Sequence, residues 1–218
     1  MANYDIVGNV AIVKFPRKEK LKGKKRFALD FLDKTKAVRT VLEKSNKFSG
    51  RLRTQKTKYL AGEKTKEALY HENGCVFRFN VDSCYFSPRL SSERKDIAEQ
   101  VKKDEVVLVM FGGVAPFAVV IAKLSKASKV ISVELGRECN KYALENVKRN
   151  KLNNVEIVQG DVRKKLKRSK EKFDRIVMAR PNLKDSFLDV AFPLIKNKGI
   201  IYYYGFYSED EKEELLEL

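Results

Sequence analysis

An apolar run that ends in a glycine turn constrains this chain more than any other stretch. Residues 106–117 read V-V-L-V-M-F-G-G-V-A-P-F, and helix-like spacing continues to Ala127. A buried parallel strand, a tight turn and a helix whose amino end faces the strand tip produce this pattern. A second apolar run, Val130 to Val133, ends in Glu134. An acidic side chain at the tip of the second strand is placed to accept hydrogen bonds from ribose hydroxyls.

The glycine turn also limits the kind of ligand. Its two glycines are too few for the G-x-G-x-x-G cradle that binds a pyrophosphate. We therefore expect a nucleoside without phosphates, such as S-adenosylmethionine. Downstream of residue 105, expected strands alternate with expected helices, which predicts a parallel, doubly wound sheet. The expected strands are 106–111, 129–134, 155–158, 173–178 and 198–204, and the expected helices are 115–127, 137–150, 183–194 and 208–216.

The first part of the chain predicts a separate, small α+β module. A strand is expected at 6–15, a helix at 27–44, and strands at 51–60 and 66–86, the last bent into a hairpin at Glu72-Asn73-Gly74. Ser87-Pro88 begins a further helix that extends to about residue 102, since proline is favoured in a first turn. Residues 163–172 are expected to be mostly a solvated basic loop, with contact to phosphate as the alternative. We place the domain boundary after residue 84, which gives domains 1–84 and 85–218.

The charge of the chain is large and uneven. Its formal net charge is +17, and residues 1–70 hold 19 Lys or Arg against 7 Asp or Glu. Such a surplus attracts polyanions and makes their binding dependent on salt. A lysine-rich, solubilising surface is the alternative, but the high charge of thermophile-like compositions is normally balanced between the signs. The charge therefore favours a nucleic acid partner.

The cysteines and the single histidine predict no metal site. Cys75, Cys84 and Cys139 lack C-x-x-C spacing, and His71 is the one histidine, so neither a zinc site nor a histidine-based triad is expected unless His71 itself serves. The cysteines form no disulfide framework, which favours a reducing cytoplasm. The start of the chain, M-A-N-Y-D-I-V, is neither basic nor apolar enough for a signal peptide, and we expect no membrane-spanning segment.

Several motifs resemble one enzyme family. Residues 85–94, Y-F-S-P-R-L-S-S-E-R, are similar to the helix that precedes the methyltransferase core in archaeal and eukaryotic tRNA (guanine-37-N1)-methyltransferases. The glycine turn, residues 142–155 and the Q-G-D-V at 159–162 resemble that family too, and D-I-V-G-N-V-A at 5–11 looks like the start of its second domain. The family also includes enzymes that transfer the aminocarboxypropyl group of the same cofactor to a wyosine precursor, and some that methylate that precursor. The resemblance implies a Rossmann-like class I methyltransferase sheet, S-adenosylmethionine as cofactor and tRNA as partner.

The resemblance also implies roles for individual residues. Glu93 would be the general base, and Arg53 the arginine that activates the guanine. Arg94 would contact the cofactor from its helix, Glu134 would bind the ribose, and Asp161 with Val162 would bind the adenine. The other implied cofactor contacts are Tyr85, Phe111, Gly112, Gly113, Val114, Leu135, Ala179 and Pro181. Without the resemblance, we would interpret Glu93 and Arg94 as a solvated pair of charges on a helix. We would interpret Arg53 as one more contact to phosphate.

The chain departs from the family pattern in three places. Val109-Met110 stands where an Asp usually ends the first strand, and Ala179-Arg180-Pro181 stands where the usual motif is Asn-Leu-Pro. The lost Asn removes an amide expected near the methionine moiety and the target base. Because the chain stops at Leu218, we expect the last strand pair and the family's N-terminal tRNA-elbow domain to be absent. The chain would then be a fragment, a minimal form, or one half of a split enzyme completed by a second chain.

Three functions stay open from the sequence. The first is a tRNA methyltransferase that modifies N1 of guanine 37. The second is aminocarboxypropyl or methyl transfer to a wyosine precursor at the same position, which the missing Asn favours and the retained Glu93 and Arg53 disfavour. The third is a non-catalytic tRNA-binding subunit.

Overall fold

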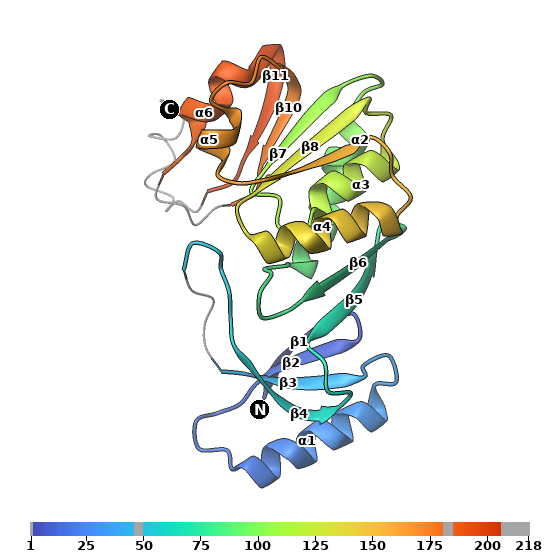
Figure 1. The fold of residues 1–218 in the computed structure, drawn as a ribbon. Coiled ribbons are helices and arrows are strands. Elements are labelled where there is room, and N and C mark those ends of the chain that lie inside the picture. The colour runs from blue at the N-terminus through green and yellow to red at the C-terminus, as the bar shows by residue number, and fades with distance from the viewer. Residues whose placement is uncertain (1, 46–49, 181–184, 206–218) are drawn as a thin grey trace, which may run out of the picture.

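The computed structural model describes residues 2–45, 50–180 and 185–205. A small α+β unit lies at one end of an elongated molecule, a parallel sheet with its helices lies at the other, and a two-stranded hairpin lies between them (Figure 1). The fold class predicted from the sequence, a Rossmann-like parallel sheet preceded by a small α+β unit, is confirmed.

The parallel sheet creates a switch point where its strand order reverses. Its order is β11-β10-β7-β8-β9, and every neighbouring pair is parallel. Strands are therefore added outward from β7 in both directions, and the crevice outside the carboxyl ends of β7 and β10 is where open α/β sheets bind ligands. The five predicted strands are all present: β7 (Val106–Met110), β8 (Lys129–Glu134), β9 (Val155–Gln159), β10 (Phe173–Met178) and β11 (Ile195–Tyr203).

Helices cover this sheet largely as predicted, with one addition. The 3₁₀ turn η1 (Pro88–Leu90) leads into α2 (Ser91–Gln100), and α3 (Pro116–Leu124) and α4 (Arg137–Arg149) follow. Within the run 163–172, predicted to be mostly a loop, residues 163–166 belong to a short helix, α5 (Val162–Leu166), which Asp161 caps. Of the helix expected at 183–194, the described residues 185–194 form α6 (Leu188–Ala191) and η2 (Phe192–Leu194). The one expected at 208–216 lies outside the described residues.

In the small unit, three elements have other boundaries than those predicted from the sequence. Its sheet has the order β1-β2-β3-β4, with β2 and β3 parallel and joined by α1. The single strand expected at 6–15 is two strands, because Gly8 turns the chain at φ +58°. The helix expected at 27–44 begins and ends earlier, and the strand expected at 51–60 begins only at residue 57. The elements are β1 (Asn3–Val7), β2 (Val10–Lys14), α1 (Leu21–Lys34), β3 (Thr40–Lys44) and β4 (Thr57–Gly62).

Asparagine side chains attach the hairpin to its neighbours. The hairpin, β5 (Glu67–Glu72) and β6 (Cys75–Asn80), turns at Asn73-Gly74 as predicted. On the β6 edge, Asn150, which caps the end of α4, accepts from the Val76 N–H and donates to its carbonyl, both at 2.8 Å. Asn146 of α4 accepts from the Arg78 N–H at 2.8 Å. On the β5 edge, Asn9 Oδ1 accepts from the Leu69 N–H at 2.6 Å. These side-chain amides form hydrogen bonds with edge groups that would pair with neighbouring strands in a longer sheet.

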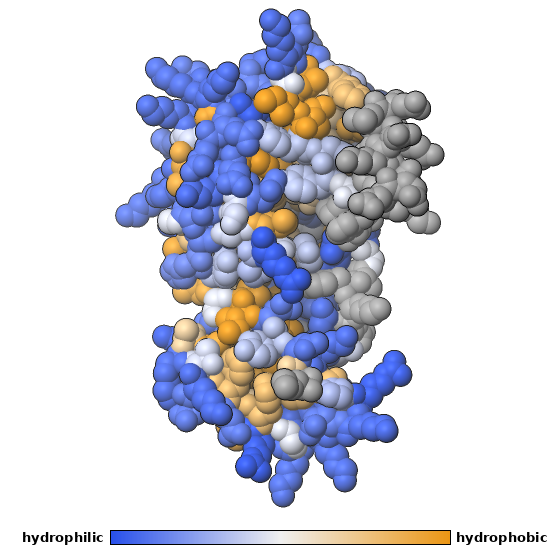
Figure 2. All heavy atoms as spheres, turned by 180° about the vertical axis from the view of Figure 1, so that it is seen from behind, coloured by the Kyte–Doolittle hydropathy of each residue, from blue (hydrophilic) through white to orange (hydrophobic). Residues whose placement is uncertain are grey.

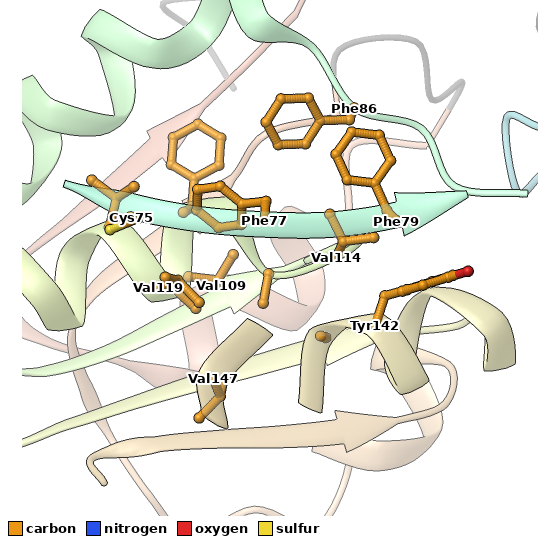
Figure 3. Close-up of a cluster of buried hydrophobic side chains, with 14 of the residues drawn as sticks. Cys75, Phe77, Phe79, Phe86, Val109, Val114, Val119, Tyr142 and Val147 are labelled. Atoms are coloured by element: carbon orange, nitrogen blue, oxygen red, sulfur yellow. The ribbon is translucent and has the colours of Figure 1, made fainter. Parts of the chain in front are cut away.

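The hairpin also contributes to the main hydrophobic core. Phe77 and Phe79 of β6 are buried together with Phe86 and pack toward Val109, Val114 and α4, as Figure 3 shows. The Phe79 and Phe86 rings stack with centroids 4.7 Å apart. Burying such rings contributes about 1.5–3 kcal/mol each, so this core fixes the segment 79–90 that leads into the parallel sheet.

Candidate cofactor and base site

A cavity opens at the switch point of the parallel sheet. It contains about 710 Å³, including the space at its mouth, and its walls come from the ends of β7, β8 and β10, from the segment 85–94 and from the loop that carries Arg53. A smaller cavity continues along the end of β9. We call the two together the crevice. The predicted residues that line it are Arg53, Tyr85, Arg94, Phe111, Gly112, Gly113, Glu134, Leu135, Asp161, Val162 and Ala179.

Two described residues of the prediction do not line the crevice. Val114 is fully buried in the core, where its carbonyl accepts a hydrogen bond from Asn146. Glu93 lies on α2, and its carboxylate accepts a hydrogen bond of 2.6 Å from the Tyr204 hydroxyl. Burial, and then this hydrogen bond, raises the pKa of Tyr204 well above its ordinary value. Pro181 lies outside the described residues.

The turn after β7 is tight and conformationally demanding. Phe111, Gly113 and Ala115 all have φ near +60°, a region that costs energy for residues with a side chain. A Cβ on Gly112 would lie 2.0 Å from the hydroxyl oxygen of the buried Ser132, so a larger residue there would have to displace that hydroxyl. The turn thereby brings the backbone N–H of Gly113 to the crevice.

Glu134 is held at the centre of the crevice by backbone groups. One carboxylate oxygen accepts from the Gly113 N–H at 2.9 Å and the other from the Gly136 N–H at 2.7 Å. The side chain therefore bridges the turn after β7 and the start of α4. A carboxylate oriented in this way retains lone pairs that can accept hydrogen bonds from ligand hydroxyls.

Asp161 forms the acceptor at the far end of the crevice. It caps α5 by accepting from the Arg163 N–H at 2.9 Å, and it forms an ion pair with Arg51. Burial alone would raise the pKa of the Asp161 carboxyl, but the hydrogen bonds from Arg51 and from the Arg163 backbone hold it below its ordinary value. Asp161 is therefore ionised and acts as an acceptor at neutral pH.

Three arginines give the crevice a positive side. Arg53 stacks on the Tyr85 ring at 4.0 Å, and Arg180 lies over Phe111 and donates to the carbonyl of Arg51. Burial lowers the pKa of Arg180; Glu134 opposes this, and the charges of Arg53 and Arg51 lower it further. Such a crowded set of cations favours an anionic ligand.

Three further residues of the site have no role in the sequence-based prediction. Two of them are Arg51 and Arg180. Arg51 stands in the R-L-R motif that contains Arg53, and Arg180 stands in the A-R-P that replaces the family's Asn-Leu-Pro. Glu72 is the third. Its side chain is 2% exposed and accepts two hydrogen bonds of 2.5 Å from Arg94, which is 1% exposed. Only the folded hairpin brings Glu72 and Arg94 together.

Other kinds of site are absent from the described part of the chain. Within residues 2–45, 50–180 and 185–205, no group of three or more His, Cys, Asp or Glu could hold a metal ion. Among the same residues, no helix is long and apolar enough to cross a membrane.

Two family models match the chain. The TRM5/TYW2 methyltransferase domain matches residues 68–217, and the TYW2 N-terminal domain matches residues 1–65. The tRNA (guanine(37)-N(1))-methyltransferase Trm5b of Pyrococcus abyssi is 38% identical over 96% of the chain, which spans 61% of that relative's length. The tRNA(Phe) (4-demethylwyosine(37)-C(7)) aminocarboxypropyltransferase of Methanocaldococcus jannaschii is 33% identical over 94% of the chain and 79% of its own length.

Solved structures agree with these matches. A complex of aTrm5 with tRNALeu has a TM-score of 0.86 at 27% identity, covering 99% of this chain and 63% of that one. The M. jannaschii TYW2 in complex with AdoMet has a TM-score of 0.71 at 27% identity, covering 97% of this chain and 80% of that one. The chain belongs to the TRM5/TYW2 methyltransferase family.

Proposed function

We propose that the chain is an S-adenosylmethionine-dependent methyltransferase that modifies N1 of guanine 37 in tRNA. The observation that carries this proposal is the position of Glu134, whose carboxylate is fixed by two backbone N–H groups between the glycine turn and Asp161. The named activity of the Pyrococcus relative supports the choice of guanine 37.

The acceptors and cations of the crevice fit this cofactor. Ribose hydroxyls can donate to Glu134, the exocyclic amine of adenine can donate to Asp161, and the methionine carboxylate can pair with Arg53 or Arg180. Arg51 already occupies one oxygen of Asp161, so the amine has to share that carboxylate or displace the arginine. The relative solved with AdoMet supports this assignment. When bound, S-adenosylmethionine supplies an electrophilic methyl group on a sulfonium.

The remaining chemistry rests on side chains of this chain. Guanine N1 carries a proton, which a carboxylate can remove. We propose this role for Glu93, which does not itself line the crevice but directly precedes Arg94, which does. Negative charge then grows on the neighbouring carbonyl oxygen, where Arg53 can stabilise it. Tyr85 holds the Arg53 guanidinium by stacking, which limits its positions. Arg94 stays a proposed cofactor contact, with its hydrogen bonds to Glu72 and Ser87 already formed.

Mass analysis of tRNA tests the proposal most directly. We expect tRNA incubated with the protein and S-adenosylmethionine to gain one methyl group on guanine 37. A gain of an aminocarboxypropyl group establishes the alternative reaction, which the replacement of the usual Asn by Ala179 and the M. jannaschii relative both favour. The absence of any gain while tRNA still binds supports a non-catalytic subunit.

Replacing Glu134 with alanine should weaken cofactor binding by about 1.5–3 kcal/mol, the usual cost of removing a charged hydrogen-bond partner. Calorimetry with S-adenosylhomocysteine measures the change. The matched control is Glu138→Ala, which removes an exposed carboxylate from the first turn of α4. Unchanged affinity in Glu134→Ala, or an equal loss in the control, contradicts the assignment of the ribose site.

We propose that the first domain binds tRNA. Exposed cations surround the start of α1, among them Lys18, Lys20, Lys22, Lys25 and Arg26. Hydrophilic side chains also project from this end of the molecule in Figure 2. Together with the aTrm5–tRNALeu complex, they support tRNA as the partner. The division after residue 84, the cytoplasmic location and a second chain stay predictions.

Reversing two of these charges should weaken tRNA binding in a salt-dependent way. In Lys22→Glu/Lys25→Glu we expect lower tRNA affinity and a log–log salt slope smaller by about one for each phosphate that the protein no longer neutralises. The control, Lys102→Glu/Lys103→Glu, changes the same charge beyond α2. Anisotropy titrations at several salt concentrations measure both slopes. Equally weakened binding in the two variants shows that the cations at the start of α1 are not the main tRNA contacts.

A further inference from the structure

The segment 51–53 extends from the small unit to the parallel sheet. In Figure 1 the chain before β4 rises from the small unit toward that sheet. All three residues line the crevice, and Arg51 lines both of its cavities. Hydrogen bonds hold the backbone here, since Arg180 donates to the Arg51 carbonyl and the Gln55 N–H donates to the Asp82 carbonyl at 3.0 Å. The Arg51 side chain is 58% exposed, so its guanidinium can change partners while the backbone stays in place.

Arg51 occupies the carboxylate that the proposed cofactor needs. One oxygen of Asp161 accepts from the Arg163 N–H at 2.9 Å, and the other pairs with Arg51. The Asp161 side chain is only 16% exposed, and the cavity beside it contains about 310 Å³, including the space at its mouth. The guanidinium and an adenine ring therefore compete for the same acceptor and the same space. Because an exposed ion pair contributes little free energy, adenine can displace Arg51 at small cost.

A displaced Arg51 adds to a local surplus of cations. Arg53 and Arg180 form no ion pair with a carboxylate of the described residues; Arg53 stacks on an aromatic ring, and Arg180 donates to a carbonyl. Burial lowers the pKa of Arg180 most, and the charges of Arg53 and Arg51 lower it further, so the three guanidinium groups lie close together. Once Asp161 no longer neutralises Arg51, the three attract an anion. Guanidinium groups bind phosphate oxygens in a bidentate manner, which makes an RNA phosphate a suitable partner.

We propose that Arg51 is a tRNA-binding residue that the cofactor releases. Without cofactor, Arg51 is paired with Asp161; adenine takes over that carboxylate, and the guanidinium turns to a phosphate of the tRNA at the mouth of the crevice. Cofactor and tRNA therefore bind cooperatively, each raising the affinity of the other by the same factor. This inference rests on the proposed function, which places adenine at Asp161 and makes tRNA the substrate. A protein that already holds its group donor thus binds tRNA best.

Titrations of tRNA with and without saturating S-adenosylhomocysteine test this proposal. The ligand has no sulfonium charge that would itself attract phosphate. We expect the wild-type protein to bind tRNA about 5-fold more tightly with the ligand, the lower end of ordinary coupling, because an exposed ion pair is weak. Saturating adenosine should also raise the affinity for tRNA, whereas purine riboside, which lacks the exocyclic amine, should leave it unchanged. Anisotropy at constant salt gives the affinities.

Two variants should abolish the coupling with different affinities for tRNA. Arg51→Met should bind tRNA as the wild type does without cofactor, and adding the ligand should not improve its binding. It should also bind S-adenosylhomocysteine more tightly than the wild type, because nothing then competes for Asp161. Asp161→Asn keeps a residue that caps α5, but it leaves Arg51 without its partner at all times. Without cofactor it should bind tRNA about 5-fold more tightly than the wild type, the full effect of the coupling.

Matched controls separate these effects from a change in net charge. Arg39→Met removes an exposed arginine that pairs with Glu63 at 3.7 Å, and Glu138→Gln removes an exposed carboxylate on α4. Both should keep the full coupling. Thermal melting confirms that each variant is folded.

The switch is overturned if the wild type shows no coupling, or if purine riboside acts as adenosine does. It is also overturned if Arg51→Met keeps the coupling, or if Asp161→Asn binds tRNA no better than Glu138→Gln. Methyl transfer by the wild type is followed in parallel. Transfer without coupling refutes only the switch, whereas a protein that binds neither S-adenosylhomocysteine nor tRNA refutes the proposed function as well.

Discussion

Replacing Glu93 with glutamine should slow group transfer by about 10²–10⁴-fold, the usual worth of general acid–base catalysis, while cofactor and tRNA still bind. The amide keeps the shape of the side chain and can still accept the Tyr204 hydrogen bond, but it does not remove the proton from guanine N1. The defect should shrink as the pH rises toward the pKa of N1, because solvent then removes that proton. Single-turnover rates at saturating cofactor and tRNA measure the effect.

Glu99→Gln is the matched control for this variant. Glu99 lies on the same helix, and its side chain is 60% exposed and pairs only loosely with Lys95, at 3.6 Å. We expect a wild-type rate and pH profile from it. A wild-type rate in Glu93→Gln would demote Glu93 to a structural partner of Tyr204. A defect that is the same at every pH would show that Glu93 acts by position rather than as a base.

Replacing Arg94 with methionine should lower the free energy of unfolding by about 3–5 kcal/mol. The variant leaves the Glu72 carboxylate buried without its partner, and it removes the hydrogen bond that Arg94 donates to the Ser87 carbonyl. Chemical denaturation followed by circular dichroism measures the change. The exposed pair Lys95–Glu99 on the same helix provides the control, because Lys95→Met should cost less than about 1 kcal/mol.

The double variant Glu72→Leu/Arg94→Met should recover most of that stability, because neither buried charge is then left alone. The recovery also separates stability from function. If the double variant is stable but binds S-adenosylhomocysteine poorly, Arg94 contributes to the cofactor site directly. A double variant as unstable as Arg94→Met contradicts the argument from the unpaired carboxylate.

The sequence was sufficient for the elements whose signals are local and strong. The run at 106–110, the glycine turn and Glu134 stand where they were predicted, because apolar periodicity and a glycine with positive φ, Gly113, act over short distances. The small unit was harder to predict. Gly8 divides one apparent strand into two by turning the chain at φ +58°, and the carbonyl of Leu69, distant in sequence, leaves no room for a side chain there. Lysines dominate the start of α1, so its helical pattern is weak.

Residues of the site could be predicted where they belong to a sequence motif. Contacts between residues distant in the sequence could not. Leu135, Asp161 and Val162, which were predicted to contact the cofactor, line the crevice, and the last two come from the Q-G-D-V motif. The ion pair between Arg51 and Asp161 joins residues 110 positions apart, and no local pattern indicates it. Likewise, nothing near Glu93 in the sequence indicates its hydrogen bond with Tyr204, since that contact depends on how β11 ends beside α2.

The asparagines on the two hairpin edges also bear on how the protein avoids misassembly. A two-stranded ribbon exposes a row of unpaired N–H and C=O groups on each side, and such rows recruit strands from other molecules. Here Asn150 and Asn146 occupy groups on the β6 edge, and Asn9 occupies one on the β5 edge. A side-chain amide ends the ladder because no further strand can add to it. The same contacts that join the hairpin to its neighbours thus protect the chain from edge-to-edge aggregation.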